Sequence, residues 1–286
     1  MILVTGATGN TGMEVVKQLR ARGAKVRALV RNPDKAPTIA GGGVETAEGD
    51  LDKPETLAPA LKGIEKVFLL SAADERQVEM QGNLVHAAKA VGVKHIVKMS
   101  SLGAALNSPV SLGRWHAQTE AQIEKSGIPF THLRPHFFMQ NMLMFAGSIA
   151  GERAFHAPMK EGKISLVDTR DIAAVAAAVL TTPGHEGKAY EVTGPEALSF
   201  SDLASKIGAA TNRNVKYVNV SSDAAREAMR AMGMHQWMAD ALVSMYVIFA
   251  AGQASGVSEI VPRVTGRPGR TFDEFAKEHA HIFKGA

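Results

Sequence analysis

Three glycines near the start of the chain, Gly6, Gly9 and Gly12, have a spacing suited to binding a phosphate. Glycine lets the backbone turn tightly and approach a pyrophosphate, and the first turn of a helix offers free N–H groups. The apolar run at residues 2–4 is typical of a buried parallel strand, and an amphipathic helical pattern extends from the glycines to Gly23. Together they predict a dinucleotide cradle with the spacing G-x-x-G-x-x-G instead of G-x-G-x-x-G.

The residues after the second predicted strand bear on the choice between NADH and NADPH. NAD-specific sites place an acid about 20 residues after the glycines to hold the ribose 2′-hydroxyl. Arg31 and Asn32 stand there instead, and Asp34 is the only acid among residues 17–35, which contain seven basic side chains. Since a guanidinium can bind a 2′-phosphate through forked hydrogen bonds, we expect NADPH, held by Arg31 first and Lys35 second. The alternative is that these charges are only solvated.

Alternating strands and helices in the first half of the chain predict an α/β fold. Strands are expected at residues 2–4, 25–31, 44–47, 66–70, 95–100 and 130–133, and helices after the glycine turn and at residues 54–61, 77–91 and 115–125. Such alternation implies a doubly wound parallel sheet of the Rossmann type, which binds ligands at the carboxyl edge of its strands. We therefore expect Asp50 and Leu51 near the adenine. Ser71 and Ala72 should lie near the phosphates or the nicotinamide ribose.

The pattern changes after Pro135. Residues 136–165 are rich in Phe, Met, Gly and Ala and show no clear alternation. Further elements are expected at residues 171–180 (helix), 189–192 (a strand that could rejoin the sheet), 199–202 (a capping box), 215–220 (strand), 222–232 and 236–250 (helices). The predicted organisation is an NAD(P)-binding domain of residues 1–135 plus 166–195 and a smaller substrate-binding lobe of residues 136–165 plus 196–286.

The composition narrows the class of protein. Of 286 residues, 45% are hydrophobic, yet no apolar run approaches the roughly 20 residues of a membrane span. Cysteine is absent, which excludes disulfides, a thiol nucleophile and Cys-ligated metals. We expect no metal, no signal peptide before the turn at Gly6, and a cytoplasmic protein. The net charge of +4 is too small to predict nucleic-acid binding, and a homodimer is left open.

Motifs at six places carry a family resemblance over nearly the whole chain. They lie at residues 5–12, 31–33, 49–51, 92–95, 126–135 and 167–173. Together they resemble the NmrA-like group of atypical short-chain dehydrogenases. Residues 113–115, 137–141 and 264–268 are similar to its branch of NAD(P)H quinone oxidoreductases, triphenylmethane-dye reductases and azoreductases.

The resemblance implies roles for particular residues. Arg31 would bind the 2′-phosphate. The residues implied to bind the pyrophosphate are Gly6, Thr8, Gly9, Asn10, Thr11 and Gly12. Those implied to lie beside the nicotinamide are Pro135, His136 and Phe137.

One departure from the resembled family concerns the proton donor. Short-chain dehydrogenases that reduce ketones use Tyr-x-x-x-Lys, in which Tyr donates a proton and Lys lowers its pKa. The matching helix here has His116 and Glu120 at these two positions, and all three Tyr residues lie far downstream. Quinones, azo bonds and cationic dyes accept a hydride readily and need at most a weak proton donor. We therefore interpret the chain as an NADPH-dependent oxidoreductase acting on a quinone-like, azo or dye-type acceptor.

Two residues are candidates for catalysis. His116 could donate a proton, since the ordinary pKa of histidine is near 6.5, but it could instead bond to the loop after the fifth strand. Ser101, which follows Ser100 at the end of that strand, could orient the substrate or only cap the strand end. Lys98 lies inside the strand and is interpreted as structural or solvated.

Aromatic and Met side chains are expected to form the substrate pocket. Phe137 and Phe138 follow the sixth strand at the carboxyl edge of the sheet, and Trp237 belongs to a second apolar cluster. Such side chains suit small, flat, polarisable ligands, and we expect these three to contact the substrate. The alternative is that they form the core of the lobe.

A second function is compatible with the same features. The founding members of the resembled family are non-catalytic NADP(H) sensors that act through a protein partner. Such a sensor would bind the cofactor without turnover.

Overall fold

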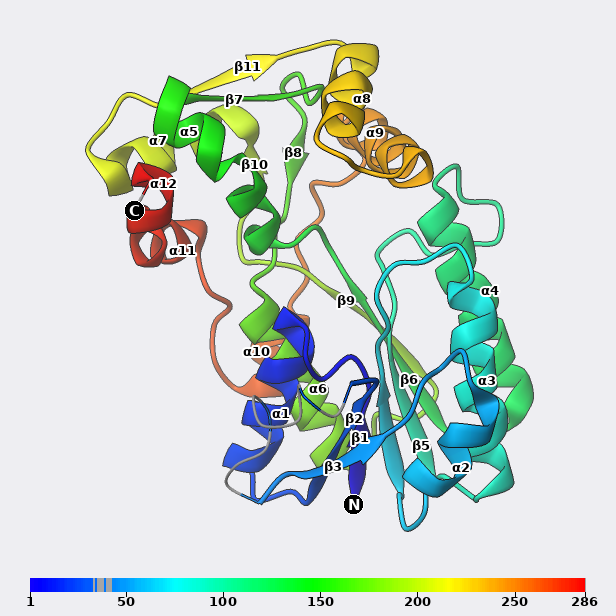
Figure 1. Ribbon diagram of the computed structural model, residues 1–286. Helices are drawn as coiled ribbons and strands as arrows, with labels where there is room; N and C mark the ends of the chain where they lie inside the picture. Colours follow the sequence, from blue (N-terminus) through cyan, green and yellow to red (C-terminus); the bar gives the residue numbers. More distant parts are fainter. Residues whose placement is uncertain (33, 35–38, 40–42, 286) are drawn as a thin grey trace.

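The computed structural model describes residues 1–32, 34, 39 and 43–285, and a seven-stranded parallel sheet forms its centre (Figure 1). The strand order is β3-β2-β1-β4-β5-β6-β9, and every neighbouring pair is parallel. The strands are β1 (Ile2–Val4), β2 (Val26–Val30), β3 (Glu45–Glu48), β4 (Lys66–Leu69), β5 (His95–Met99), β6 (Phe130–Pro135) and β9 (Lys188–Val192). This confirms the predicted Rossmann-type sheet, including the strand that rejoins it after residue 188.

Helices cover both faces of the sheet (Figure 1). One face carries α1 (Asn10–Ala21), α6 (Thr169–Thr181) and α10 (Ile260–Thr265), and the other carries η2 (Pro54–Thr56), α2 (Leu57–Ala60), α3 (Gln77–Ala90) and α4 (Ser111–Ser126). A parallel sheet is buried on both faces, so every residue of β1 and β5 is buried, including His95 and Lys98 of β5. The helix predicted at residues 115–125 begins earlier than expected, at Ser111.

A second core lies beyond the carboxyl edge of the sheet. It is built from η3 (Met139–Phe145), α5 (Ala146–Glu152), α7 (Phe200–Thr211), α8 (Ser222–Ala231), α9 (Gln236–Ala250), α11 (Phe272–Glu278) and α12 (Ala280–Lys284), with the strand pairs β7 (Ala154–Ala157) with β11 (Lys216–Asn219) and β8 (Lys163–Ile164) with β10 (Leu198–Ser199). Buried phenylalanines at 155, 200, 272, 275 and 283 fill it. The predicted capping box of α7 is present at Ser199 and Asp202. The domain boundaries stay predictions.

Several short elements escaped the sequence analysis. The stretch 136–165, whose sequence shows no clear alternation, contains η3, α5, β7 and β8. Their periodicity is hidden because each has only two to seven residues. The end of the chain also forms α10, α11 and α12, of which α11 carries a capping box at Thr271 and Glu274 that could have revealed it. No described helix is long and apolar enough to span a membrane.

A buried carboxylate fastens the end of the chain to the sheet layer. Asp171, in the first turn of α6, is fully buried and accepts hydrogen bonds from the Arg270 backbone N–H at 2.6 Å and from its guanidinium at 2.5 Å. The guanidinium of Arg267 lies 3.3 Å from the same carboxylate. Asp171 therefore couples α6 to the segment between α10 and α11.

Neutralising this carboxylate should destabilise the fold. Asp171→Asn leaves two half-buried guanidinium groups without their anion, which should lower the free energy of unfolding by about 2–4 kcal/mol. The matched control is Asp223→Asn, because Asp223 pairs with Arg226 while 86% exposed, and it should cost less than about 1 kcal/mol. Urea unfolding checks both, and equal losses would contradict the role assigned to Asp171.

Candidate active site

A cleft of about 530 Å³ opens at the carboxyl edge of β1, β2, β3 and β4. Its far wall comes from η3 and the start of α6, so two segments distant in sequence close it. The predicted site residues that line it are Gly6, Thr8, Gly9, Asn10, Thr11, Arg31, Asp50, Leu51, Ser71, Ala72 and Phe138. Lys35 lies outside the described residues. The predicted site residues that are not among the described lining are Gly12, Ser101, His116, Pro135, His136, Phe137 and Trp237.

The glycine turn brings the first strand and the first helix into close contact. Gly6 has a φ of +62°, a conformation that L side chains rarely adopt, and its carbonyl accepts the N–H of Gly9 at 3.0 Å. A Cβ on Gly12 would lie 2.1 Å from the Gly6 carbonyl oxygen, which no side chain can tolerate. Gly6 is thus required for the turn, and Gly12 for the packing of α1 against it.

The first turn of α1 is suited to an anion. Its N-cap residue is Gly9, with extended backbone, and no acidic side chain stands in the first turn. Within the described part of the chain, no side chain caps these N–H groups. The partial positive charge of the helix end therefore remains available, and a pyrophosphate fits this position without displacing a carboxylate.

Side-chain hydrogen bonds fix the strand ends around the turn. Thr5 Oγ1 donates to the Leu70 carbonyl at 2.6 Å and accepts the Leu70 N–H at 2.8 Å, which ties β1 to β4. Gln81 donates to Ser71 Oγ at 2.7 Å from α3. The backbone N–H of Asp50 donates to Thr56 Oγ1 at 2.9 Å. Hydrogen bonds within the protein therefore hold the cleft wall in place.

Arg31 differs from its basic neighbours. Arg27 is committed to Glu45 at 2.9 Å and to the carbonyls of Ala60 and Lys62. The exposed side chain of Arg31 lines the cleft, and none of the residues that the structure describes pairs with its guanidinium. Of Arg27 and Arg31, only Arg31 is positioned to bind a ligand in the cleft.

Several lining residues were not singled out from the sequence. Gln140 and Asn141 of η3 and Thr169 of α6 face the glycine turn across the cleft. Gln140 Oε1 accepts the Thr169 N–H at 3.1 Å, which joins η3 to α6. The motif at residues 137–141 was noted for its resemblance, but the spacing of an irregular segment does not show which side chains point inward.

The residues after β6 divide between the cleft and the second core. Phe138 lines the cleft, whereas Phe137 packs edge-on against Tyr246 and Phe249. His136 is buried and bonds through Nε2 to the Ala254 carbonyl at 2.9 Å. Burial lowers the pKa of His136 to about 4, against the effect of that bond. The side chains of His136 and Phe137 are therefore engaged in packing.

Trp237, the third predicted substrate contact, is not among the described lining residues of the cleft. Its ring on α9 lies 5.4 Å from that of Trp115 on α4, between centroids. Trp115 directly precedes His116, so this aromatic pair joins the second lobe to the helix that bears the candidate proton donor.

His116 lies beside Lys98, for which the structure excludes the solvated alternative and leaves the structural one. Lys98 is fully buried, not solvated, and its Nζ lies 3.0 Å from His116 Nδ1. Gln77 Nε2 approaches the same ring atom at 3.3 Å. Burial, and then the charge of Lys98, hold the pKa of His116 well below its ordinary value. The ring is bonded to β5 and α3, and not to the loop after β5.

The two serines at the end of β5 have different environments. Ser100 is buried and donates to Glu120 Oε1 at 2.5 Å, while Arg134 holds both oxygens of that carboxylate at 3.0 and 2.6 Å. Ser101 is partly exposed, and its carbonyl accepts the N–H of Ala104. Ser100 is thus committed to Glu120, and the substrate role of Ser101 stays a prediction.

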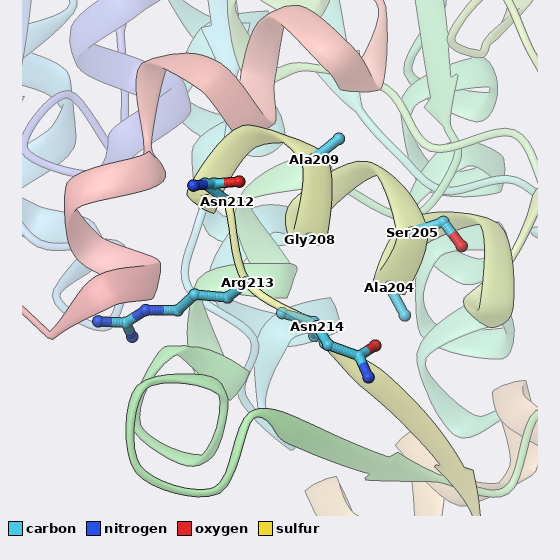
Figure 2. Close-up of a pocket in the computed structure, with 8 residues that line it drawn as sticks. Ala204, Ser205, Gly208, Ala209, Asn212, Arg213 and Asn214 are labelled. Atoms are coloured by element: carbon cyan, nitrogen blue, oxygen red, sulfur yellow. The ribbon is translucent and has the colours of Figure 1, made fainter.

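A second depression, of about 480 Å³, lies at the end of α7 in the other lobe (Figure 2). It is lined by Ala204, Ser205, Gly208, Ala209, Asn212, Arg213, Asn214 and Val215. In Figure 2 the Arg213 side chain extends away from the helix, and its Nη1 bonds to the Lys284 carbonyl at 3.4 Å. None of the predicted site residues belongs to it.

Comparisons with known proteins agree with this geometry. The model of the NmrA-like family matches residues 1–276. The NAD(P)H azoreductase of Xenophilus azovorans is 47% identical over 286 residues, which is 100% of both chains. The NADPH-dependent quinone oxidoreductase of Escherichia coli, solved with NADPH, has 33% identity and a TM-score of 0.90, covering 97% of this chain and 99% of that one. The Citrobacter sp. triphenylmethane reductase complexed with NADP(H) has 28% identity and a TM-score of 0.89, covering 98% and 100%.

Adding a methyl group at Gly12 should disrupt the cradle. Gly12→Ala forces α1 away from the Gly6 carbonyl, so it should cost about 1–3 kcal/mol of stability and weaken dinucleotide binding at least about tenfold. Gly147→Ala is the control, because a Cβ there meets nothing within 4 Å. Thermal unfolding and a fluorescence titration with NADPH check this, and unchanged affinity in Gly12→Ala would contradict it.

Proposed function

The chain belongs to the NmrA-like family and is an NAD(P)H-dependent oxidoreductase, and we propose that it uses NADPH to reduce quinone-like, azo or dye-type acceptors. The observation that carries the proposal is one cleft lined by both a glycine turn and the guanidinium of Arg31, which pairs with none of the described residues. The turn suits a pyrophosphate, and the guanidinium suits the 2′-phosphate that distinguishes NADPH from NADH.

The strand order indicates which residues would hold each part of NADPH. The glycine turn after β1 would hold the pyrophosphate, and Arg31 and Asp50, which follow β2 and β3, would hold the adenosine end. Ser71 and Phe138 would contact the nicotinamide end. When bound, NADPH supplies a hydride from its nicotinamide ring. The protein holds the acceptor against that ring and excludes water.

The acceptor class follows from what the site offers. Leu70, Met80, Phe138 and Met144 give the cleft apolar and polarisable surface, which suits flat conjugated molecules. Glu120, which stands where ketone-reducing short-chain dehydrogenases have their lysine, is bonded to Ser100 and Arg134. This helix therefore lacks the Tyr and Lys pair with which short-chain dehydrogenases reduce ketones. The named relatives reduce azo compounds, quinones and triphenylmethane dyes.

The proposal is tested by NADPH oxidation at 340 nm against a panel of quinones and azo dyes, with NADH in parallel. Acceptor-dependent oxidation that prefers NADPH supports it. Tight NADPH binding without turnover on any acceptor would overturn it in favour of the NADP(H) sensor, and a search for a protein partner would follow.

Removing the guanidinium at position 31 should remove the preference for NADPH. Arg31→Ala is expected to raise the KM for NADPH about 10- to 100-fold, since a charge-assisted fork is lost. The KM for NADH should stay within about twofold, because NADH has no 2′-phosphate. Arg22→Ala is the matched control, as Arg22 is exposed beyond the other end of α1. An unchanged NADPH to NADH ratio in Arg31→Ala would rule out this role.

A further inference from the structure

We infer that Lys98 is a positioning residue for His116 and that the two form a proton relay to the acceptor. The inference rests on the proposed reductase function and names the proton source of that reaction. It assigns a role to Lys98, which is fully buried in β5.

The geometry places a cation on one side of the imidazole. Lys98 Nζ donates to the Met99 carbonyl at 2.9 Å and faces His116 Nδ1 at 3.0 Å. An ammonium can only donate, so Nδ1 accepts and the ring carries its hydrogen on Nε2. Gln77 can donate to the same Nδ1 through its amide. No residue in the described part of the chain bonds Nε2, which leaves that N–H for a ligand.

The pair is connected to the wall of the cleft through α3, and neither side chain is among the described lining residues. Lys98 is near the carboxyl end of β5, which neighbours β4, and Ser71 after β4 lines the cleft. On α3, Gln81 bonds to Ser71 and Gln77, one turn earlier, bonds to His116. One helix therefore contacts both the cleft wall and the imidazole.

A lysine thus reaches the proton donor from a different element than in the short-chain dehydrogenases that reduce ketones. There the lysine follows the donor by four residues on one helix. Here that position is Glu120, which is bonded to Ser100 and Arg134. Lys98 approaches the ring from β5 instead, and the sequence spacing hides this pairing.

The relay accounts for the proton that most acceptors need. A quinone or azo bond that takes a hydride becomes an anion on oxygen or nitrogen. His116 donates the Nε2 proton to that atom, and Nδ1 takes a proton from the Lys98 ammonium. The ring ends neutral with hydrogen on Nδ1, Lys98 becomes an amine, and water later returns the proton to it.

The surroundings of Lys98 suit this transfer. Burial lowers the pKa of Lys98 to about 7, against the opposing charge of Glu120. His132 on β6 also senses the Lys98 charge, and Arg134 is paired with Glu120. An ammonium with a pKa near neutrality gives up its proton far more readily than an exposed lysine.

The test compares two acceptors, of which one needs a proton after hydride transfer and the other does not. Crystal violet is a carbocation, so hydride addition alone gives its neutral leuco form, whereas a benzoquinone also needs a proton. His116→Gln should lower kcat on the quinone about 100-fold and Lys98→Met about 10-fold, with kcat on crystal violet and the KM for NADPH within about twofold. Lys94→Met, at an exposed lysine just before β5, is the control.

Two further readouts separate a relay from a structural role. The wild-type kcat on the quinone should fall above pH 7, because the Lys98 ammonium deprotonates there, and Lys98→Met should lose that dependence. Nitrogen-15 NMR of the His116 ring should show hydrogen on Nε2 at neutral pH. Melting temperatures of the variants report whether they fold.

The outcomes distinguish the relay from the function on which it rests. The relay alone would be overturned if folded variants lost kcat equally on both acceptors. It would also be overturned if His116 in the enzyme without acceptor carried its hydrogen on Nδ1. A wild type that reduces neither acceptor would overturn the reductase function and the relay with it.

Discussion

The contact between Gly12 and the Gly6 carbonyl is the constraint on which the cleft depends. Because neither residue has a Cβ, α1 packs directly against the turn and presents its uncapped first N–H groups toward the carboxyl edge of the sheet. A side chain at Gly12 would displace the helix and remove the anion site. Thr5, bonded to Leu70, holds the neighbouring strand end in the same register. Cofactor recognition thus begins with backbone packing.

Two buried charged side chains near the cleft, Glu120 and Lys98, have different hydrogen-bond partners and different roles. Glu120 is held by Ser100 and Arg134, so its negative charge is satisfied within the protein. Lys98 has a carbonyl and a neutral imidazole as hydrogen-bond partners, with Glu120 acting on it only through its charge. A buried ammonium without a bonded anion is costly, which explains its low pKa. Glu120 and its partners therefore stabilise the fold, whereas Lys98 can exchange a proton with His116.

Much of the fold and of the cofactor site was predictable from the sequence, because these features depend on local patterns. Apolar runs followed by amphipathic helices predicted the parallel sheet, which the strand pairing confirms. The glycine spacing predicted the turn, and Arg31, Asp50 and Ser71 line the cleft as strand-end residues should. These follow from the period of a helix or strand and from the rule that ligands lie at the carboxyl edge.

By itself, the sequence determined the order of the elements and the residues at the strand ends, since both depend on spacing along the chain. Only the tertiary structure decided that Gln140 and Thr169 close the cleft and that Phe137 belongs to the second core. It alone placed Lys98 against His116, because β5 and α4 meet through packing that no local pattern encodes. Side chains from different elements become neighbours only when the sheet and its helices assemble.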